Sequence, residues 1–302
     1  MAEALAKTGL EAAHYAALLP PLLLQAANIA NTIEQGVHGR RRTGMGDSFW
    51  QFRPYHWGDD LRYIDWRQSA KSDRLFLRQT EWDAAQSAFL WCDMSPSMHY
   101  TSQKKWPEKL ERALLLNLSL CHLLVRAGER VAYWDGAMRP ISGKGAVERF
   151  MNQVSVNIRS ATQKTLPPPA ILSAHAQVIL VSDFFLPLED IAFFIHHLTE
   201  ADIHGHLIQV TDPAEETMPF QGRIRFQGLE EEGNILFSRT ENIRNAYLDK
   251  LNNHREGLRA ITHNAGWTLS HHRTDQPITA TLLHAHRALS VTLDNHPARR
   301  FT

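Results

Sequence analysis

Two apolar segments that each end at an aspartate place the strongest constraint on how this chain folds. Residues 88–92 (AFLWC) lead directly into Asp93, and residues 178–182 (VILVS) lead into Asp183. Continuous apolar runs of this length are typical of strands buried on both faces, as in a parallel sheet. Because the carboxyl ends of parallel strands meet at one edge of a sheet, we expect the two aspartates to lie close together. A third aspartate, Asp212, also follows an apolar run, but it precedes a proline, and we interpret this pair as the start of a turn.

The pattern after residue 87 predicts an α/β fold with a doubly wound, mostly parallel central sheet. Apolar strand patterns alternate there with helical ones, which is the order of a parallel sheet covered by helices. The segment 108–126 is apolar around its whole middle, so we expect this helix to pack centrally against the sheet. Further expected strands are 130–134, 206–211 and 267–269, with a short edge strand at 138–141, and further expected helices are 146–157, 188–199 and 241–263.

The residues around Asp93 predict a site for a hard divalent cation. Asp93-Met94-Ser95-Pro96-Ser97 sets a carboxylate and two hydroxyls at alternate positions, where the strand leaves the sheet. Mg²⁺ prefers such oxygen ligands, and Asp183 would add a second carboxylate. We therefore predict weak binding of Mg²⁺ or Mn²⁺. The alternative is that Asp93 and Asp183 cap the helices that follow them, without a metal.

A further oxygen ligand is expected from the loop at residues 158–177. Thr165 is the preferred candidate, because Leu166 and the prolines at 167–169 then fit the start of a short helix. Thr162 is the alternative ligand. A plain surface loop explains the same residues equally well, since hydroxyls are common in loops.

Composition and charge narrow the class of protein. Of the 302 residues, 43% are hydrophobic and 21% charged, which suits a globular protein with a sizeable core. Lys+Arg and Asp+Glu balance at 32 each, so no overall charge attracts nucleic acid or an anionic membrane. The apolar stretch 15–30 is interrupted by Pro20 and Pro21, and the N-terminus lacks the pattern of a secretory signal. Cys92 and Cys121 are expected to be buried free thiols, and we expect a cytoplasmic protein without a membrane span.

The sequence divides into an N-terminal part at residues 1–83 and a main domain at 84–302. The N-terminal part begins with a helical pattern and continues into an arm, residues 46–83, that is rich in Arg, Asp and Trp. Because exposed tryptophan is costly, we expect Trp57 and Trp66 to be buried. The charges of the arm would then pair and hold it on the main domain, with direct contact to a partner as the alternative.

The arm and two later segments resemble a known family. The residues that show this most specifically are Arg53-Pro54-Tyr55, Gly58-Asp59-Asp60, Arg62, Ile64-Asp65-Trp66, Ser69-Ala70-Lys71, Val181-Ser182-Asp183-Phe184 and Thr211-Asp212-Pro213-Ala214-Glu215. Over about residues 15–290 the chain resembles the bacterial domain-of-unknown-function family numbered fifty-eight. Members of that family look like von Willebrand factor A domains with an N-terminal extension, so the resemblance implies that fold.

The same resemblance implies a metal-ion-dependent adhesion site. Carried over residue by residue, its ligands are Asp93, Ser95, Ser97, Thr165 and Asp183. In such sites a carboxylate from a partner protein completes the metal shell, so the site binds proteins and turns over no substrate. The family also tends to be encoded beside AAA+ ATPases of the MoxR type, which implies an adaptor for such an ATPase.

Two other functions are compatible with the residues. A metal-dependent hydrolase would need a general base, for which His99 is the candidate, although a surface histidine is the plainer interpretation. A metal-free scaffold with a degenerate site is the second alternative. Zinc binding by the histidines at 271, 272, 284 and 286 is disfavoured, because no cysteine is near them in sequence and an exposed C-terminal helix explains them.

Overall fold

The computed structural model describes residues 2–37, 49–55, 64–71, 74–80, 86–136, 139–159, 165–173, 175–228 and 233–294. The chain divides into two compact units, and each is described by itself. The larger unit contains residues 1–35 and 86–302, and the smaller unit contains residues 36–85. The N-terminal helix therefore belongs with the main domain, whereas the sequence pattern grouped it with the arm.

The larger unit is built on a five-stranded sheet in which every pair of neighbouring strands is parallel. Its strands are β3 (Ser87–Cys92), β4 (Arg130–Tyr133), β5 (Gln177–Ser182), β6 (His204–Thr211) and β9 (Thr268–Arg273). The three central strands β3, β5 and β6 are buried over nearly their whole length, because helices cover both faces of the sheet. The predicted α/β class and mostly parallel sheet are confirmed.

The strand order places a switch point between β3 and β5. The order across the sheet is β4-β3-β5-β6-β9, so the first strand of the sheet has the second on one side and the third on the other. Connections that leave the carboxyl ends of β3 and β5 therefore run in opposite directions and leave a crevice between them. Asp93 and Asp183 directly follow these two strands, so the topology brings both to this crevice.

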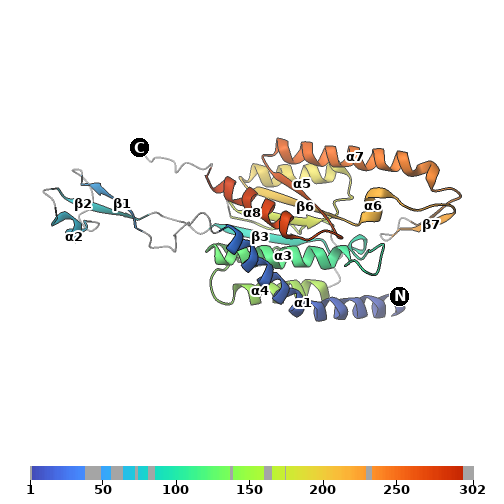
Figure 1. The fold of residues 1–302 in the computed structure, drawn as a ribbon, viewed down its shortest axis with the longest axis horizontal. Helices are drawn as coiled ribbons and strands as arrows, with labels where there is room; N and C mark the ends of the chain where they lie inside the picture. The colour runs from blue at the N-terminus through green and yellow to red at the C-terminus, as the bar shows by residue number, and fades with distance from the viewer. Residues whose placement is uncertain are drawn as a thin grey trace. The chain divides into compact units, whose positions relative to one another are not determined.

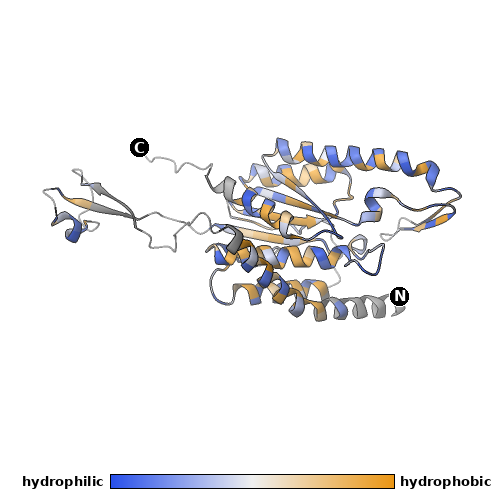
Figure 2. Ribbon diagram, in the orientation of Figure 1, coloured by the Kyte–Doolittle hydropathy of each residue, from blue (hydrophilic) through white to orange (hydrophobic). Residues whose placement is uncertain are grey.

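Helices form a layer on each side of the sheet (Figure 1). One layer contains α1 (Ala2–Val37), α3 (Lys109–Arg126), α4 (Ala146–Arg159) and α8 (Thr279–Asp294), and the other contains α5 (Leu188–Glu200) and α7 (Glu241–Asn264). Figure 2 shows α3 as largely apolar and α7 as largely polar, as expected for an inner and an outer helix.

The helix α3 forms the centre of the core, as its apolar sequence predicts. Leu114, Leu116, Leu118 and Leu120 are completely buried, although they point in different directions around the helix. The helix packs against strands of the sheet on one side and against neighbouring helices on the other, so no face of its middle turns is exposed to water. This burial on all sides explains why the sequence shows no polar face there.

The helix α1 packs its apolar stripe into the same core. Leu19, Leu22, Ala26, Ala30 and Ile33 recur at intervals of three or four residues and are all buried, as one face of a helix requires. The side chain of Arg126 at the end of α3 also hydrogen-bonds Asn31. These contacts explain why α1 belongs to the larger unit.

The remaining elements of the larger unit are short. They are η2 (Pro96–Met98), α6 (Pro213–Thr217) and the antiparallel pair β7 (Ile224–Gln227) and β8 (Asn234–Phe237), of which the β7–β8 hairpin was not predicted. The predicted edge strand at 138–141 is reduced to one antiparallel bridge between Val131 and Ile141, with residues 137–138 outside the described chain. The prediction of a short helix that begins at the prolines 167–169 is wrong, because residues 167–173 are irregular.

Within its described residues, the smaller unit contains an antiparallel strand pair and one helical turn. Its elements are β1 (Phe49–Pro54), β2 (Phe76–Thr80) and α2 (Trp66–Ser69). Asp65 caps α2 by accepting a hydrogen bond from the Gln68 amide at 2.8 Å, so its carboxylate serves the helix backbone. Trp66 is 66% exposed, so the expectation that it is buried is wrong. Trp57 lies outside the described residues.

Two further expectations concern the chain as a whole. Within the described residues, no helix combines the length and the apolar character that crossing a bilayer would require. Cys92 and Cys121 are both buried free thiols, as predicted.

Candidate functional site

Asp93 is held in a fixed orientation at the carboxyl end of β3. Its amide continues the ladder with β5 by donating to the Val181 carbonyl oxygen at 2.8 Å. Its carboxylate accepts one hydrogen bond from the Ser95 amide at 2.8 Å and another from the Ser182 hydroxyl at 2.6 Å. The side chain is buried, so the crevice presents an oriented carboxylate with little access to bulk water.

Asp183 occupies the equivalent position after β5. Its Oδ1 atom accepts from the Phe185 amide at 3.2 Å, and its carbonyl oxygen accepts from the Gln209 side chain at 3.0 Å. Phe184 adopts a left-handed backbone conformation with φ of 53°, which turns the chain sharply after the strand. Local backbone geometry therefore directs the Asp183 carboxylate toward the crevice.

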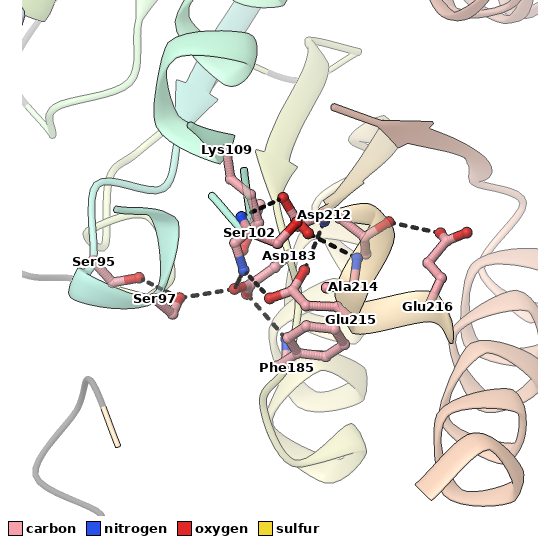
Figure 3. Close-up of polar contacts among 12 residues, drawn as sticks. Ser95, Ser97, Ser102, Lys109, Asp183, Phe185, Asp212, Ala214, Glu215 and Glu216 are labelled. Carbon is pink, nitrogen blue, oxygen red and sulfur yellow. Dashed lines mark hydrogen bonds and ion pairs between the residues drawn. The ribbon is translucent and has the colours of Figure 1, made fainter. Parts of the chain in front are cut away.

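The two serines connect the aspartates into one hydrogen-bond network. The Ser97 hydroxyl donates to Asp183 Oδ2 at 2.8 Å, and the Ser95 and Ser97 hydroxyl oxygens lie 3.1 Å apart (Figure 3). Because the single Ser97 hydroxyl hydrogen goes to Asp183, Ser95 must be the donor in the serine pair. The structure thus brings together four of the five predicted ligands, Asp93, Ser95, Ser97 and Asp183.

Thr165 is not part of this network. It lies in the described chain and is half-buried, but among the described residues it makes no hydrogen bond with Asp93, Ser95, Ser97 or Asp183. The alternative Thr162 lies outside the described residues.

The capping interpretation of the two aspartates is wrong. The N-cap positions of η2, α3 and α5 are occupied by Ser95, Glu108 and Pro187. Asp93 and Asp183 instead each accept a hydrogen bond from the amide two residues later, which is an Asx-turn. This bond fixes the turn after each strand and stabilises no helix directly.

Sequence reasoning missed Lys109, the first residue of α3. Its ammonium donates to Asp183 Oδ2 at 2.9 Å and to Glu215 Oε1 at 2.6 Å, and only 1% of its side chain is exposed. Figure 3 shows Lys109 reaching between the two carboxylates. A signal was available, because Lys109 continues the apolar stripe of Ala113, Leu116 and Leu120 toward the start of the helix, where a lysine would be buried.

Asp212 positions Glu215 through a capping box. Asp212 accepts from the Ala214 amide at 2.7 Å, while its own amide donates to Glu215 Oε2 at 2.8 Å. The Asp-Pro pair was predicted to start a turn, and in the structure it begins the helix α6, with Asp212 as the N-cap. Asp212 also accepts from the Ser102 amide at 3.0 Å, which connects α6 to the loop after η2.

The crevice is electronegative. Burial, together with the nearby Asp183 charge, raises the pKa of Asp93 to about 7. Burial also raises the pKa of Glu215 and outweighs the opposing effect of Lys109. Burial alone would lower the pKa of Lys109, but the charges of Asp183 and Glu215 raise it above its usual value. Two carboxylates, Asp183 and Glu215, thus contact one ammonium, which leaves negative charge in excess.

The donor set fits a hard cation through its oxygen chemistry. Within the described chain, no three His, Cys, Asp or Glu side chains are grouped as metal ligands, so a cation here would depend on the hydroxyls of Ser95 and Ser97. Hydroxyls and carboxylates are suitable ligands for Mg²⁺ or Mn²⁺. The excess negative charge of the network is a second feature that favours a cation.

The histidines singled out by the sequence bind protein groups elsewhere. His271 pairs with Glu216 at 2.7 Å, His272 contacts the Thr281 hydroxyl at 3.1 Å, and His284 contacts the Ser270 hydroxyl at 2.7 Å. His99 is the C-cap residue of η2 and is half-buried.

These features define an α/β protein with a parallel sheet and a polar, largely buried site at the carboxyl ends of the strands that flank its switch point. The family model described as "Protein of unknown function DUF58" matches residues 51–257, and the chain belongs to this family. The match includes parts of both compact units, among them the signature residues of the arm. Comparison with curated proteins found no match.

Similar solved structures are distant. The conserved hypothetical protein BatB from Bacteroides thetaiotaomicron is 14% identical, with a TM-score of 0.38, over 70% of this chain and 100% of that chain. An aerotolerance-related membrane protein from Bacteroides fragilis is 11% identical, with a TM-score of 0.38, over 68% of this chain and 100% of that chain. An uncharacterized membrane spanning protein from Vibrio fischeri is 10% identical, with a TM-score of 0.17, over 70% of this chain and 100% of that chain.

Proposed function

We propose that this chain is a non-enzymatic protein-interaction module of the von Willebrand factor A type, which binds its partner at the carboxyl ends of β3 and β5. The main support is the network in which Ser95 and Ser97 connect to the Asp183 carboxylate beside buried Asp93. These oxygens converge at the switch point of the sheet, where open α/β sheets bind their ligands.

The proposed cofactor is Mg²⁺ or Mn²⁺. Ser95, Ser97 and Asp183 would hold it directly or through water, with Asp93 orienting the site, while Thr165 as a further ligand rests on the family resemblance alone. When bound, the ion supplies a positive charge that can accept a carboxylate from a partner. The residues of the chain orient the ion and limit its contact with water, and no substrate is turned over.

The proposed partner is a protein that presents Asp or Glu to this edge. A MoxR-type AAA+ ATPase is the candidate that the family resemblance implies. Recognition of an acidic residue by a bound cation would make complex formation depend on both the metal and the carboxylate, because each is needed for the contact.

A pull-down from native cells, with the full chain as bait, tests this function. We expect an AAA+ ATPase to be recovered in Mg²⁺ and lost in EDTA, and lost also with the double variant Ser95→Ala and Ser97→Ala. The matched control replaces two exposed serines, Ser142 and Ser238, by alanine and should keep the partner.

Two outcomes would contradict the proposal. Recovery that is unaffected by EDTA and by the Ser95 and Ser97 substitutions would exclude metal-bridged binding. Absence of any partner, combined with metal-dependent hydrolysis that His99→Ala abolishes, would favour the hydrolase.

One observation favours the metal-free scaffold as a second candidate. The Lys109 ammonium already neutralises part of the Asp183 charge without a metal. In that case the binding of a partner would need no divalent ion, and EDTA would have no effect on it.

A further inference from the structure

We propose that the Lys109 ammonium is the resident cation of this site, and that a divalent ion binds Asp183 only in competition with it. The inference deepens the proposed function and rests on it, because it concerns how the same site takes up its metal. It assigns a role to Lys109 and Glu215, neither of which belongs to the ligand set expected from sequence.

The contacts of Lys109 are those of a bound cation. Its Nζ atom lies 2.9 Å from Asp183 Oδ2 and 2.6 Å from Glu215 Oε1. The aromatic rings of Phe185 and Tyr100 lie 5.4 and 6.0 Å from the same atom, measured to the ring centroids. A buried ammonium needs such anionic and aromatic neighbours to offset its desolvation, and Lys109 has both.

Competition follows from the atom that Lys109 uses. Asp183 Oδ2 accepts hydrogen bonds from both Lys109 Nζ and Ser97 Oγ. A divalent ion held by Ser97 and Asp183 would therefore lie close to the ammonium, in a site with little water to screen the two positive charges. The ion can bind favourably only when the ammonium moves away from Asp183.

Glu215 provides a place for the displaced ammonium. Its Oε1 atom accepts from Lys109, while its Oε2 atom is held by the Asp212 amide at 2.8 Å in the capping box of α6. The carboxylate is thus anchored independently of Asp183. Lys109 can release Asp183 and keep Glu215, so metal uptake need not leave a buried charge without a partner.

Titration of the full chain with Mn²⁺ by isothermal calorimetry tests the competition. Lys109→Met removes the ammonium and nearly preserves the side-chain volume, and we expect it to bind Mn²⁺ roughly tenfold more tightly than wild type or better, because like-charge repulsion is removed. The control Lys104→Met removes an exposed lysine from the neighbouring loop and should bind as wild type does.

Two additional variants guard against loss of fold. Lys109→Met combined with Glu215→Gln removes one charge of each sign and should also bind Mn²⁺ more tightly than wild type. Glu215→Gln alone keeps the ammonium but removes one of its two carboxylate partners. The ammonium then depends on Asp183 and is harder to displace, so we expect weaker Mn²⁺ binding. Thermal melting of each variant without metal shows whether it is folded.

The outcomes separate this inference from the proposed function. The competition is overturned if folded Lys109→Met binds Mn²⁺ no more tightly than wild type, or if Glu215→Gln binds it as tightly as wild type or more tightly. In either case, Mn²⁺ binding by wild type would still support the metal site of the proposed function. Binding by Lys109→Met but not by wild type supports the competition and refutes metal dependence in the natural protein. No binding by any folded variant refutes both.

Discussion

At the level of single residues, each carboxylate of the site is oriented by donors from more than one segment. Asp93 is held by the amide of Ser95 and by the hydroxyl of Ser182 on β5, and Asp183 by the Phe185 amide, Ser97 and Lys109. Donors from separate strands and turns restrict both the position and the rotation of a carboxylate. The site is therefore preorganised before any ligand arrives.

Hydroxyl groups also hold a buried histidine on β6. His206 is bound by the Thr268 hydroxyl at 2.6 Å and the Ser270 hydroxyl at 2.9 Å. Burial, with a smaller effect of His284, lowers the pKa of His206 to about 3. Between about pH 6.5 and 3 the unfolded chain therefore binds a proton that the folded chain does not, so this histidine lowers the free energy of unfolding as the pH falls.

Replacing His206 by Gln should remove this pH dependence and keep polar contacts. Between pH 7 and pH 5, we expect wild type to lose roughly 2 kcal/mol more unfolding free energy than His206→Gln, as proton linkage requires. Urea denaturation at the two pH values measures the difference. His196→Gln, at an exposed position on α5, is the control and should follow wild type. Parallel losses in wild type and His206→Gln would show that His206 does not titrate as expected.

At the level of elements, short helices position the site and long helices stabilise it. The five-residue helix α6 exists because its capping box satisfies both the Asp212 amide and the amides of the first turn. That cap directs Glu215 toward Lys109. The long helices α1 and α3 contribute buried apolar surface, and α3 also supplies Lys109 from its first turn.

Paired substitutions on α1 test its place in the core. Leu22 is 4% exposed and Leu24 is 70% exposed, although they are two residues apart. Leu22→Ala should lower the free energy of unfolding by about 3 kcal/mol, the usual cost of a cavity of this size, whereas Leu24→Ala should cost about 0.5 kcal/mol or less. Chemical denaturation of the full chain measures both. Equal small costs would mean that α1 is not part of the core of the larger unit.

At the level of the whole molecule, the family match spans two compact units. The signature residues at 53–71 lie in the smaller unit, and the Asp93 network lies in the larger one. The smaller unit has its own supports, since the Ser69 hydroxyl donates to the Asp65 carbonyl oxygen at 2.8 Å and accepts from the Phe76 amide at 2.9 Å. Within it, Trp66 remains largely exposed.

Trp66→Ala should therefore have little effect on stability. We expect it to lower the free energy of unfolding by less than about 1 kcal/mol, as for other exposed side chains. Ser69→Ala should cost more, about 1 to 2 kcal/mol, because it leaves the Phe76 amide without its acceptor. Urea denaturation followed by far-ultraviolet circular dichroism compares the two. A cost near 3 kcal/mol for Trp66→Ala would indicate that this ring is buried by another part of the chain or by a second copy.

Local sequence patterns were sufficient to predict the parallel sheet and the meeting of Asp93 with Asp183. Apolar runs reveal buried strands, and the carboxyl ends of parallel strands necessarily share an edge. Ser95 and Ser97 followed because they lie within four residues of Asp93. Proximity along the chain and the geometry of the sheet supplied all of this information.

The other partners of the site depended on tertiary packing. Lys109 and Glu215 are separated by 106 residues, and their contact requires both the start of α3 and the cap of α6 to face the same crevice. The position of Thr165 depends on an irregular loop, and the exposure of Trp66 depends on what packs around a single helical turn. Neither has a periodic pattern, because such contacts are decided by the arrangement of distant segments in space.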